Sequence, residues 1–267
     1  MSSITTRTLL EMKEKGERIV ALTCYDALFA RLLDASGVDI LLVGDSLNQV
    51  LAGAPSTLSA TLDQMIYHTR MVRRGTERAM VICDMPFLSY QVSAEEAVRN
   101  CGRAMKETGC TAVKLEGGQP MASTVRRLVD VGIPVMGHLG LTPQSVHALG
   151  GHRVQGRDDA TAERLKTDAK ALEDAGAFAV VLELVPAPLA SQITKSLTIP
   201  TIGIGAGPAC DGQVLVLHDM LGLNDEFSAK FVKKYAALAE DVREAARVFA
   251  AEVREGRYPG PEHSFGK

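Results

Sequence analysis

The sequence predicts an α/β protein with a single (β/α)8 barrel, known as a TIM barrel. Short, continuously apolar runs rich in β-branched residues recur eight times along the 267 residues. Such runs are typical of parallel strands that are covered on both faces. Helical patterns fill most of the gaps, which indicates repeated strand–helix units. Eight units within this length favour a closed barrel over an open, doubly wound sheet.

The expected strands are spread over almost the whole chain. They comprise residues 18–22, 39–44, 80–84, 111–116, 133–138, 178–183, 199–204 and 213–217. Residues 1–17 should form an extra N-terminal helix, centred on 5–15, that could cover the floor of the barrel. Residues 256–267 contain Pro and Gly and lose helical periodicity, so a surface tail is expected there. No low-complexity linker divides the chain, and we expect one domain over residues 1–267.

Local signals mark the expected helix ends. A glycine able to act as a left-handed C-cap precedes several strands, at Gly37, Gly109, Gly132 and Gly176. The segments Thr61–Gln64 and Ser93–Glu96 fit the capping-box pattern of a helix start. Two strand-to-helix connections, 47–60 and 139–158, are longer than usual. Because barrel active sites lie on that side, both connections are candidate lids.

The amino-acid composition excludes several classes of binding partner and of structural site. The 29 basic and 32 acidic residues are spread along the chain and leave a net charge of −3, which gives no charged stripe for nucleic acid or a membrane surface. The five cysteines are odd in number and lack Cys-x-x-Cys spacing, which argues against a disulfide framework or a structural zinc site. Neither a signal peptide nor a membrane-spanning run is recognisable, so a cytoplasmic protein with a small-molecule substrate is expected.

Four acidic residues lie where apolar runs stop: Asp45, Asp84, Glu116 and Glu183. A buried strand gains nothing by ending on an unpaired charge, so this repetition indicates a shared cation or substrate. Mg²⁺ commonly takes one or two protein carboxylates and completes its shell with water and substrate oxygens, which suits Asp45 and Asp84. Each aspartate alone could equally cap the following helix.

Three further side chains could take part in the same chemistry. Lys114 and Glu116 alternate with Leu115 and so lie on one face of a strand, where Lys114 could neutralise a substrate carboxylate and Glu116 could bind the metal or its waters. An internal salt bridge is the alternative. His138 ends the fifth expected strand and could donate a hydrogen bond to substrate, although a lone histidine is more often structural. Glu183, at the end of an apolar strand, is a candidate general base or a salt-bridged strand end.

Motifs along nearly the whole chain resemble those of the ketopantoate hydroxymethyltransferases. The resemblance is carried, in order, by residues 21–26, 43–46, 84–87, 113–118, 137–144, 154–157, 202–207, 211–213 and 262–265. Such an ordered set is far more specific than any one motif. One departure is Leu47-Asn48, where the family commonly has Gly-Met, so the loop above the metal could differ in shape.

The resemblance implies a (β/α)8 barrel that uses Mg²⁺ and assembles as a homodecamer. The implied reaction transfers a one-carbon unit from 5,10-methylenetetrahydrofolate to 3-methyl-2-oxobutanoate, giving 2-dehydropantoate for pantothenate and coenzyme A synthesis. By matching motifs, the metal is assigned to Asp45, Asp84 and Glu116, the oxo acid to Asp45, Ser46, Asp84, Lys114 and His138, and the base to Glu183. Nothing in the residues alone identifies folate.

Two rival interpretations remain open. A lyase of the phosphoenolpyruvate mutase and isocitrate lyase type would also combine Mg²⁺, a 2-oxo acid and a barrel, but the chain lacks the Lys-Lys-Cys-Gly-His or Lys-Arg-Cys-Gly-His segment of those lyases. A non-catalytic barrel that binds metal and oxo acid is the second rival, because the fold alone does not specify function.

Overall fold

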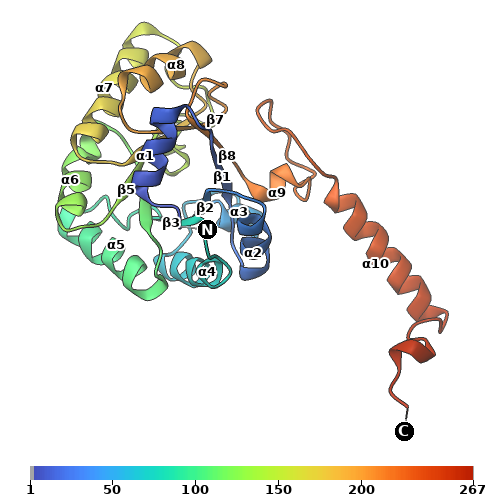
Figure 1. The fold of residues 1–267 in the computed structure, drawn as a ribbon. Coiled ribbons are helices and arrows are strands. Elements are labelled where there is room, and N and C mark those ends of the chain that lie inside the picture. The colour runs from blue at the N-terminus through green and yellow to red at the C-terminus, as the bar shows by residue number, and fades with distance from the viewer. Residues whose placement is uncertain (1–2, 267) are drawn as a thin grey trace. The chain divides into compact units, whose positions relative to one another are not determined.

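The computed structural model describes residues 3–266 and contains a closed barrel of parallel strands, which confirms the predicted fold (Figure 1). Neighbouring strands pair in sequence order, and β1 closes the barrel by pairing with β8. The strands are β1 (Ile19–Thr23), β2 (Ile40–Val43), β3 (Met80–Asp84), β4 (Ala112–Glu116), β5 (Val135–Gly140), β6 (Ala179–Glu183), β7 (Thr201–Ile204) and β8 (Gly212–Leu215). Every residue of β2, β3 and β4 is buried, as the continuous apolar runs predict.

Helices alternate with the strands through most of the chain. They are α1 (Thr6–Lys15), α2 (Ala27–Ala35), α3 (Leu47–Val50), α4 (Leu62–Arg74), α5 (Ala94–Thr108), α6 (Ala122–Asp130), α7 (Asp159–Asp174), α8 (Ala187–Ser196), α9 (Leu217–Met220) and α10 (Leu238–Arg254). Short 3-10 turns add η1 (Gln119–Met121), η2 (Pro143–Ser145) and η3 (Pro261–His263). The capping box at Thr61–Gln64 is confirmed, and Gly109 ends α5 in the left-handed conformation.

The extra helix α1 lies against the end of the barrel where the strands begin (Figure 1). Its Leu9 is fully buried. Lys13 Nζ lies 2.8 Å from an oxygen of Asp211, which directly precedes β8, and 3.1 Å from the carbonyl oxygen of Thr194. These contacts place α1 opposite the carboxyl ends of the strands, so the other end stays available for a site.

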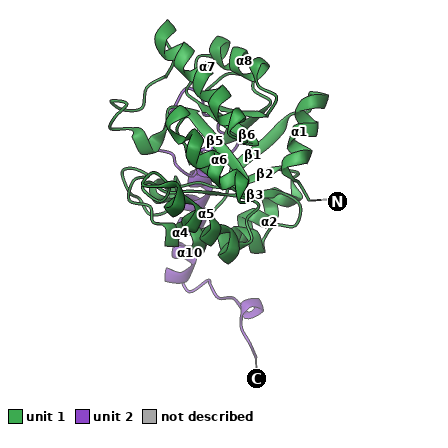
Figure 2. Ribbon diagram, turned by 90° about the vertical axis from the view of Figure 1, so that its left-hand side faces the viewer, with its two compact units in different colours: residues 1–216 green, residues 217–267 purple. Residues whose placement is uncertain are grey.

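Contacts divide the chain into two compact units, residues 1–216 and 217–267, which Figure 2 colours separately. The first unit contains all eight barrel strands, and the second contains α9, α10 and η3. Helix α10 ends at Arg254, just before the expected tail at residues 256–267, and the tail contains the short turn η3. A single domain over 1–267 stays a prediction.

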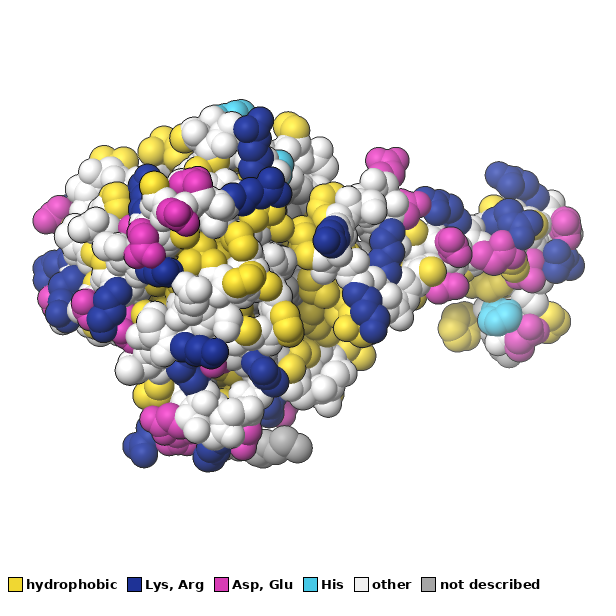
Figure 3. Space-filling model, turned by 90° about the horizontal axis from the view of Figure 1, so that it is seen from above, with side chains coloured by type: hydrophobic (Ala, Val, Ile, Leu, Met, Phe, Trp, Pro, Cys, Tyr) yellow, Lys and Arg dark blue, Asp and Glu magenta, His cyan; other side chains and the backbone are white. Residues whose placement is uncertain are grey.

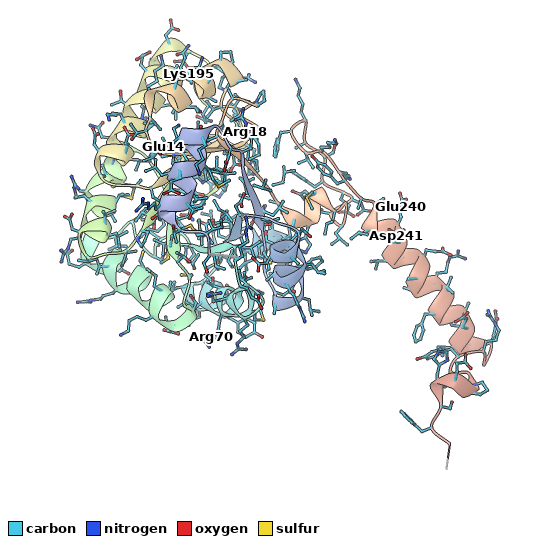
Figure 4. The ribbon with its side chains drawn as sticks, in the orientation of Figure 1. Glu14, Arg18, Arg70, Lys195, Glu240 and Asp241 are labelled. Atoms are coloured by element: carbon cyan, nitrogen blue, oxygen red, sulfur yellow. The ribbon has the colours of Figure 1, made fainter. Side chains whose placement is uncertain are left out.

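Charged side chains of both signs are interspersed on the face drawn in Figure 3, with hydrophobic side chains between them. Outer helices carry exposed charges such as Glu14, Arg70 and Lys195, which Figure 4 labels. The five cysteines are free and buried, in agreement with packing thiols. Within residues 3–266, no helix combines the length and apolarity that a membrane crossing requires.

Candidate active site

The predicted site residues meet at the carboxyl end of the barrel. Asp84, Glu116 and Glu183 are the last residues of β3, β4 and β6, and Asp45 follows β2 by two residues. Parallel strands bring their carboxyl ends to one edge, so short strands that stop at these acids gather them in one place. All but Glu183 are at least nine-tenths buried, with Asp84 only 2% exposed. The site is therefore a dense, enclosed group of charges.

Lys114 reaches across to the neighbouring strand. Its Nζ lies 2.7 Å from Oδ1 of Asp84 and 3.9 Å from Oε1 of Glu116. Burial disfavours the ammonium, but the negative charges of Asp84, Glu116 and Asp45 outweigh burial and hold the pKa of Lys114 above its usual value. The lysine is thus a permanent cation, and the salt bridge left open as an alternative is present between β4 and β3.

Asp45 and Asp84 are neighbouring buried carboxylates, of which Asp84 pairs with Lys114 while Asp45 accepts a hydrogen bond from the neutral Gln144 amide. The backbone N–H of Asp45 donates to Oδ2 of Asp84 over 3.3 Å. Burial, followed by the charges of Asp84 and Glu116, raises the pKa of Asp45 well above its ordinary value. Burial also raises the pKa of Asp84, although Lys114 opposes the rise. Such a pair lowers its free energy by sharing a divalent cation, so its donor chemistry fits Mg²⁺.

The third predicted metal ligand, Glu116, contacts His138 and the backbone of Gln144. Its Oε1 lies 3.3 Å from Nδ1 of His138, and its Oε2 accepts the backbone N–H of Gln144 over 3.0 Å. Across residues 3–266, no group of three or more His, Cys, Asp or Glu side chains is arranged as a ready-made metal cage. Metal coordination by Asp45, Asp84 and Glu116 therefore stays a prediction, with the aspartates closer to that role than Glu116.

His138 lies between two carboxylates. Besides Glu116, it contacts Glu183, whose Oε2 lies 3.2 Å from Nε2. Burial and the charge of Lys114 disfavour the imidazolium, but Glu116 and Glu183 outweigh them and raise the pKa of His138 to about 9. For Glu116, burial opposes ionisation, while His138, Lys114 and the Gln144 amide leave its pKa below the usual value. The histidine is thus charged at neutral pH and links β5 to the ends of β4 and β6 on its two sides.

Gln144, which the sequence did not single out, connects these groups. Its side-chain nitrogen donates to Oδ2 of Asp45 and to the carbonyl of Met85, both over 2.9 Å. Its side-chain oxygen accepts from Tyr90 Oη over 2.8 Å and from Gln91 over 3.0 Å. The residue enters the site from η2, inside the candidate lid 139–158. The sequence feature that could have identified Gln144 as a site residue is its position at the end of the motif at residues 137–144.

Ser46 lies at the rim of the same group of residues. Its Oγ is 2.9 Å from the hydroxyl of Tyr25, so a partner from the segment after β1 holds the serine beside Asp45. The departure at Leu47-Asn48 falls in the short helix α3, where both residues are buried. Asn48 donates to the Ser56 carbonyl over 2.7 Å, which ties α3 to the loop that follows it.

Comparison with known proteins identifies the family. The model of the family described as ketopantoate hydroxymethyltransferase matches residues 3–261. The chain belongs to this family. A ketopantoate hydroxymethyltransferase relative from Syntrophus aciditrophicus, named 3-methyl-2-oxobutanoate hydroxymethyltransferase, is 58% identical over 98% of this chain and 96% of its own length. One from Syntrophotalea carbinolica with the same name is 56% identical, with 98% of each chain covered.

Solved structures of other enzymes resemble the barrel of this chain. Phosphonopyruvate hydrolase in complex with oxalate and Mg²⁺ aligns with a TM-score of 0.64 at 13% identity and covers 97% of this chain and 93% of its own. 2,3-Dimethylmalate lyase, a member of the PEP mutase/isocitrate lyase superfamily, aligns with a TM-score of 0.62 at 17% identity, covering 98% and 93%. At these identities the likeness shows the fold alone.

Proposed function

We propose that the protein transfers a hydroxymethyl group from 5,10-methylenetetrahydrofolate to 3-methyl-2-oxobutanoate in a Mg²⁺-dependent reaction. The product would be 2-dehydropantoate, a precursor of pantothenate and coenzyme A. The observation that carries the proposal is the buried Asp45–Asp84 pair beside the cation Lys114, at the same barrel end as the His138–Glu183 contact. The names of the relatives, at 53–58% identity, support the same reaction.

The two aspartates would hold the metal, and Glu116 would act on its water shell or join it. When bound, Mg²⁺ would polarise the ketone and carboxylate oxygens of the oxo acid. Lys114 and Ser46 would contact the oxo acid directly. Lys114 is already oriented by Asp84, and Ser46 by Tyr25, so neither side chain has to be ordered on binding.

Glu183 would remove the proton at C3 of the oxo acid. Its carboxylate is the most exposed of the acidic groups, with a side chain 17% exposed, so it retains access to substrate. His138 fixes one oxygen of Glu183 and leaves the other free to act as base. The charged His138 also stabilises the negative charge that develops on the oxo acid at this end of the barrel.

The overall transfer balances with one water molecule. The methylene carbon of the donor exchanges its two C–N bonds for a bond to C3 of the oxo acid and a bond to the water oxygen. The two carrier nitrogens gain the C3 proton and one water proton, while the second water proton stays on the new hydroxyl. No oxidant or reductant is required.

Proton exchange in D₂O tests the first half of this reaction without folate. Wild-type protein with Mg²⁺ should exchange the C3 proton of 3-methyl-2-oxobutanoate, followed by proton NMR. Glu183→Gln should slow exchange and turnover together by about 100-fold or more, with little change in oxo-acid affinity. The exposed Glu14→Gln is the matched control. Exchange as fast in Glu183→Gln as in wild type would place the base elsewhere.

A further inference from the structure

A cavity of about 510 Å³ lies beside the charged group and is lined by none of its members except Glu116. It opens between the segments that follow β3, β4 and β5 and the first turns of α7. Its volume falls within the roughly 300–1,000 Å³ of small-molecule sites. Gln144 and Glu116 form the wall that it shares with the oxo-acid site, so a ligand in it would lie next to the reacting centre.

One lining residue of the cavity, on β5, lies against the end of β6. Gly140, one of its lining residues, has φ of 92°, and a Cβ there would lie 2.1 Å from the carbonyl oxygen of Glu183. Only glycine allows β5 and β6 to approach this closely. The next residue, Leu141, donates its N–H to the same carbonyl over 2.8 Å. Gly140 and Leu141 therefore hold this part of the cavity wall against the backbone of Glu183, the proposed base.

The lining is mainly apolar, with two buried acids, Glu116 on the shared wall and Asp168 on α7. Phe87, Met121 and Leu165 supply flat and aliphatic surface. Asp168 on α7 is 7% exposed and accepts the Gln119 N–H over 2.7 Å through Oδ1. Among residues 3–266, the ion pair formed by its Oδ2 is with Arg164, whose Nε is 3.7 Å away and whose side chain is 73% exposed. An ionised carboxylate has about four acceptor positions, so Asp168 retains capacity to accept hydrogen bonds from a ligand.

A second cavity, of about 480 Å³, continues from the first. The two share Gln155, Gly156 and Thr161 in their linings. The second cavity adds exposed cationic groups, Arg153 and Arg157. Together the two cavities form a continuous site. The first part is mainly apolar and contains Asp168 as a buried hydrogen-bond acceptor, and the second part carries the two arginines. That order of chemistry matches a ligand with a flat, hydrogen-bond-donating head and an anionic tail.

We infer that these adjoining cavities bind the one-carbon donor, a reduced pterin carrying a glutamate tail, with the head in the first cavity and the tail in the second. This assignment rests on the proposed function and adds the location of its second substrate. The aminopyrimidinone edge of a pterin presents two parallel N–H donors, which suit the carboxylate of Asp168. The tail carboxylates would meet Arg153 and Arg157. The apolar chamber would keep water from the reactive methylene group.

Tetrahydrofolate binding tests the head cavity. Ala148 is exposed and lines the cavity, so Ala148→Trp should fill it without disturbing the fold, whereas the exposed neighbour His147 is outside the lining. We expect Ala148→Trp to weaken binding of tetrahydrofolate, measured by calorimetry, by about tenfold or more, and His147→Trp to leave it within about twofold. Asp168→Asn should weaken binding in the same direction.

The D₂O exchange assay runs in parallel, because it requires the oxo-acid site but no folate. Exchange in Ala148→Trp within about twofold of wild type shows that the fold and that site are intact. Unchanged tetrahydrofolate affinity in both Ala148→Trp and Asp168→Asn would overturn the cavity assignment, as would a wild-type protein that exchanges the proton but binds no tetrahydrofolate. Absence of exchange and turnover in wild type would instead overturn the proposed function.

A separate experiment tests the second cavity, which is proposed to hold the glutamate tail. Arg157→Gln should weaken a tetraglutamyl form of tetrahydrofolate by about fivefold or more and the monoglutamyl form much less, since each lost charge contact removes a fraction of the tail binding energy. Lys195→Gln, an exposed substitution on α8 outside both linings, is the charge-matched control. Equal effects of Arg157→Gln on both ligands, or none on either, would remove Arg157 from the tail site.

Discussion

The Nε2 atom of His138 lies 3.2 Å from Oε2 of Glu183, so an ion pair joins the ends of β5 and β6 where the base is proposed. The same imidazole contacts Glu116 through its other nitrogen, 3.3 Å from Oε1. A neutral imidazole has one N–H donor and would leave one carboxylate without it. The charged form is attracted by both carboxylates, which is why the pKa of His138 rises despite burial.

Stability of the metal-free protein should therefore fall at high pH. The pKa of His138 is raised from 6.5 to about 9 in the folded state. Its contribution is fully present below the unfolded value and is lost as pH rises through about 9. Denaturant unfolding with EDTA should show a decline between these values that His138→Gln lacks. The same decline in His138→Gln would assign it to another group.

Asp45→Ala and Asp84→Ala should each weaken Mg²⁺ and oxo-acid binding together. Substrate would complete the metal's coordination shell, so the two ligands depend on the same pair of carboxylates. Calorimetric titration of 3-methyl-2-oxobutanoate with and without Mg²⁺ measures this dependence. The exposed Asp63→Ala is the control. Metal-independent oxo-acid affinity, unchanged in both variants, would contradict the metal assignment.

Gln144→Leu should raise the Mg²⁺ concentration needed for half-saturation by about tenfold, because Asp45 and Tyr90 each lose a buried partner worth about 1–3 kcal/mol. The Gln144 amide also lowers the pKa of Asp45, so the pH profile of Mg²⁺ binding should move to higher pH. Gln49→Leu, on the exposed side of α3, should do neither. A loss of stability with an unmoved pH profile would show that Gln144 is only structural.

Lys114→Met should destabilise the metal-free protein by about 3–5 kcal/mol, since Asp84 would keep a buried charge without its partner. Replacing both residues, as Lys114→Met with Asp84→Asn, should restore part of that free energy of unfolding. Chemical denaturation of the single and double variants, each with EDTA, gives the comparison. Additive losses in the double variant would argue against a coupled pair.

The homodecamer expected from the family resemblance is testable in solution. Apolar side chains on α10, among them Val242 and Phe249, are 58% and 54% exposed in the single chain, which is unusual for a monomer. Light scattering should give a mass near ten chains, and Phe249→Glu should reduce it. The nearby exposed substitution Glu244→Gln should not. A stable monomer of wild-type protein would contradict the expectation.

Most strands could be predicted because both of their faces are buried, which leaves continuous apolar runs in the sequence. β5 was predicted to end at His138 but runs to Gly140, because the close approach to Glu183 keeps the backbone paired beyond the apolar run. The acidic residues could be placed at one end because parallel strands share that edge. Their side-chain contacts could not be predicted, such as those of Glu116 with His138 and with the Gln144 amide.

Gln144 could not be predicted from strand patterns, because its position depends on how a loop folds back over the barrel. Its contacts with Asp45, Glu116 and Tyr90 join segments that are far apart in sequence. The cavity beside it has the same origin, since its walls come from three loops and α7. The periodicity of apolar residues predicts single helices and strands. It does not predict contacts between loops that are far apart in the sequence.

The pairing of β1 with β8 has a consequence for the order of events during synthesis. Ile19 pairs with Gly212, so the first strand leaves the ribosome long before its last neighbour exists. Until then one edge of β1 has unpaired backbone groups, and such an edge is open to pairing with other chains. Contacts of this sequence separation also slow folding. Expression at lower temperature or with more chaperone should therefore raise the soluble yield of variants that weaken β8 more than that of variants that weaken β4.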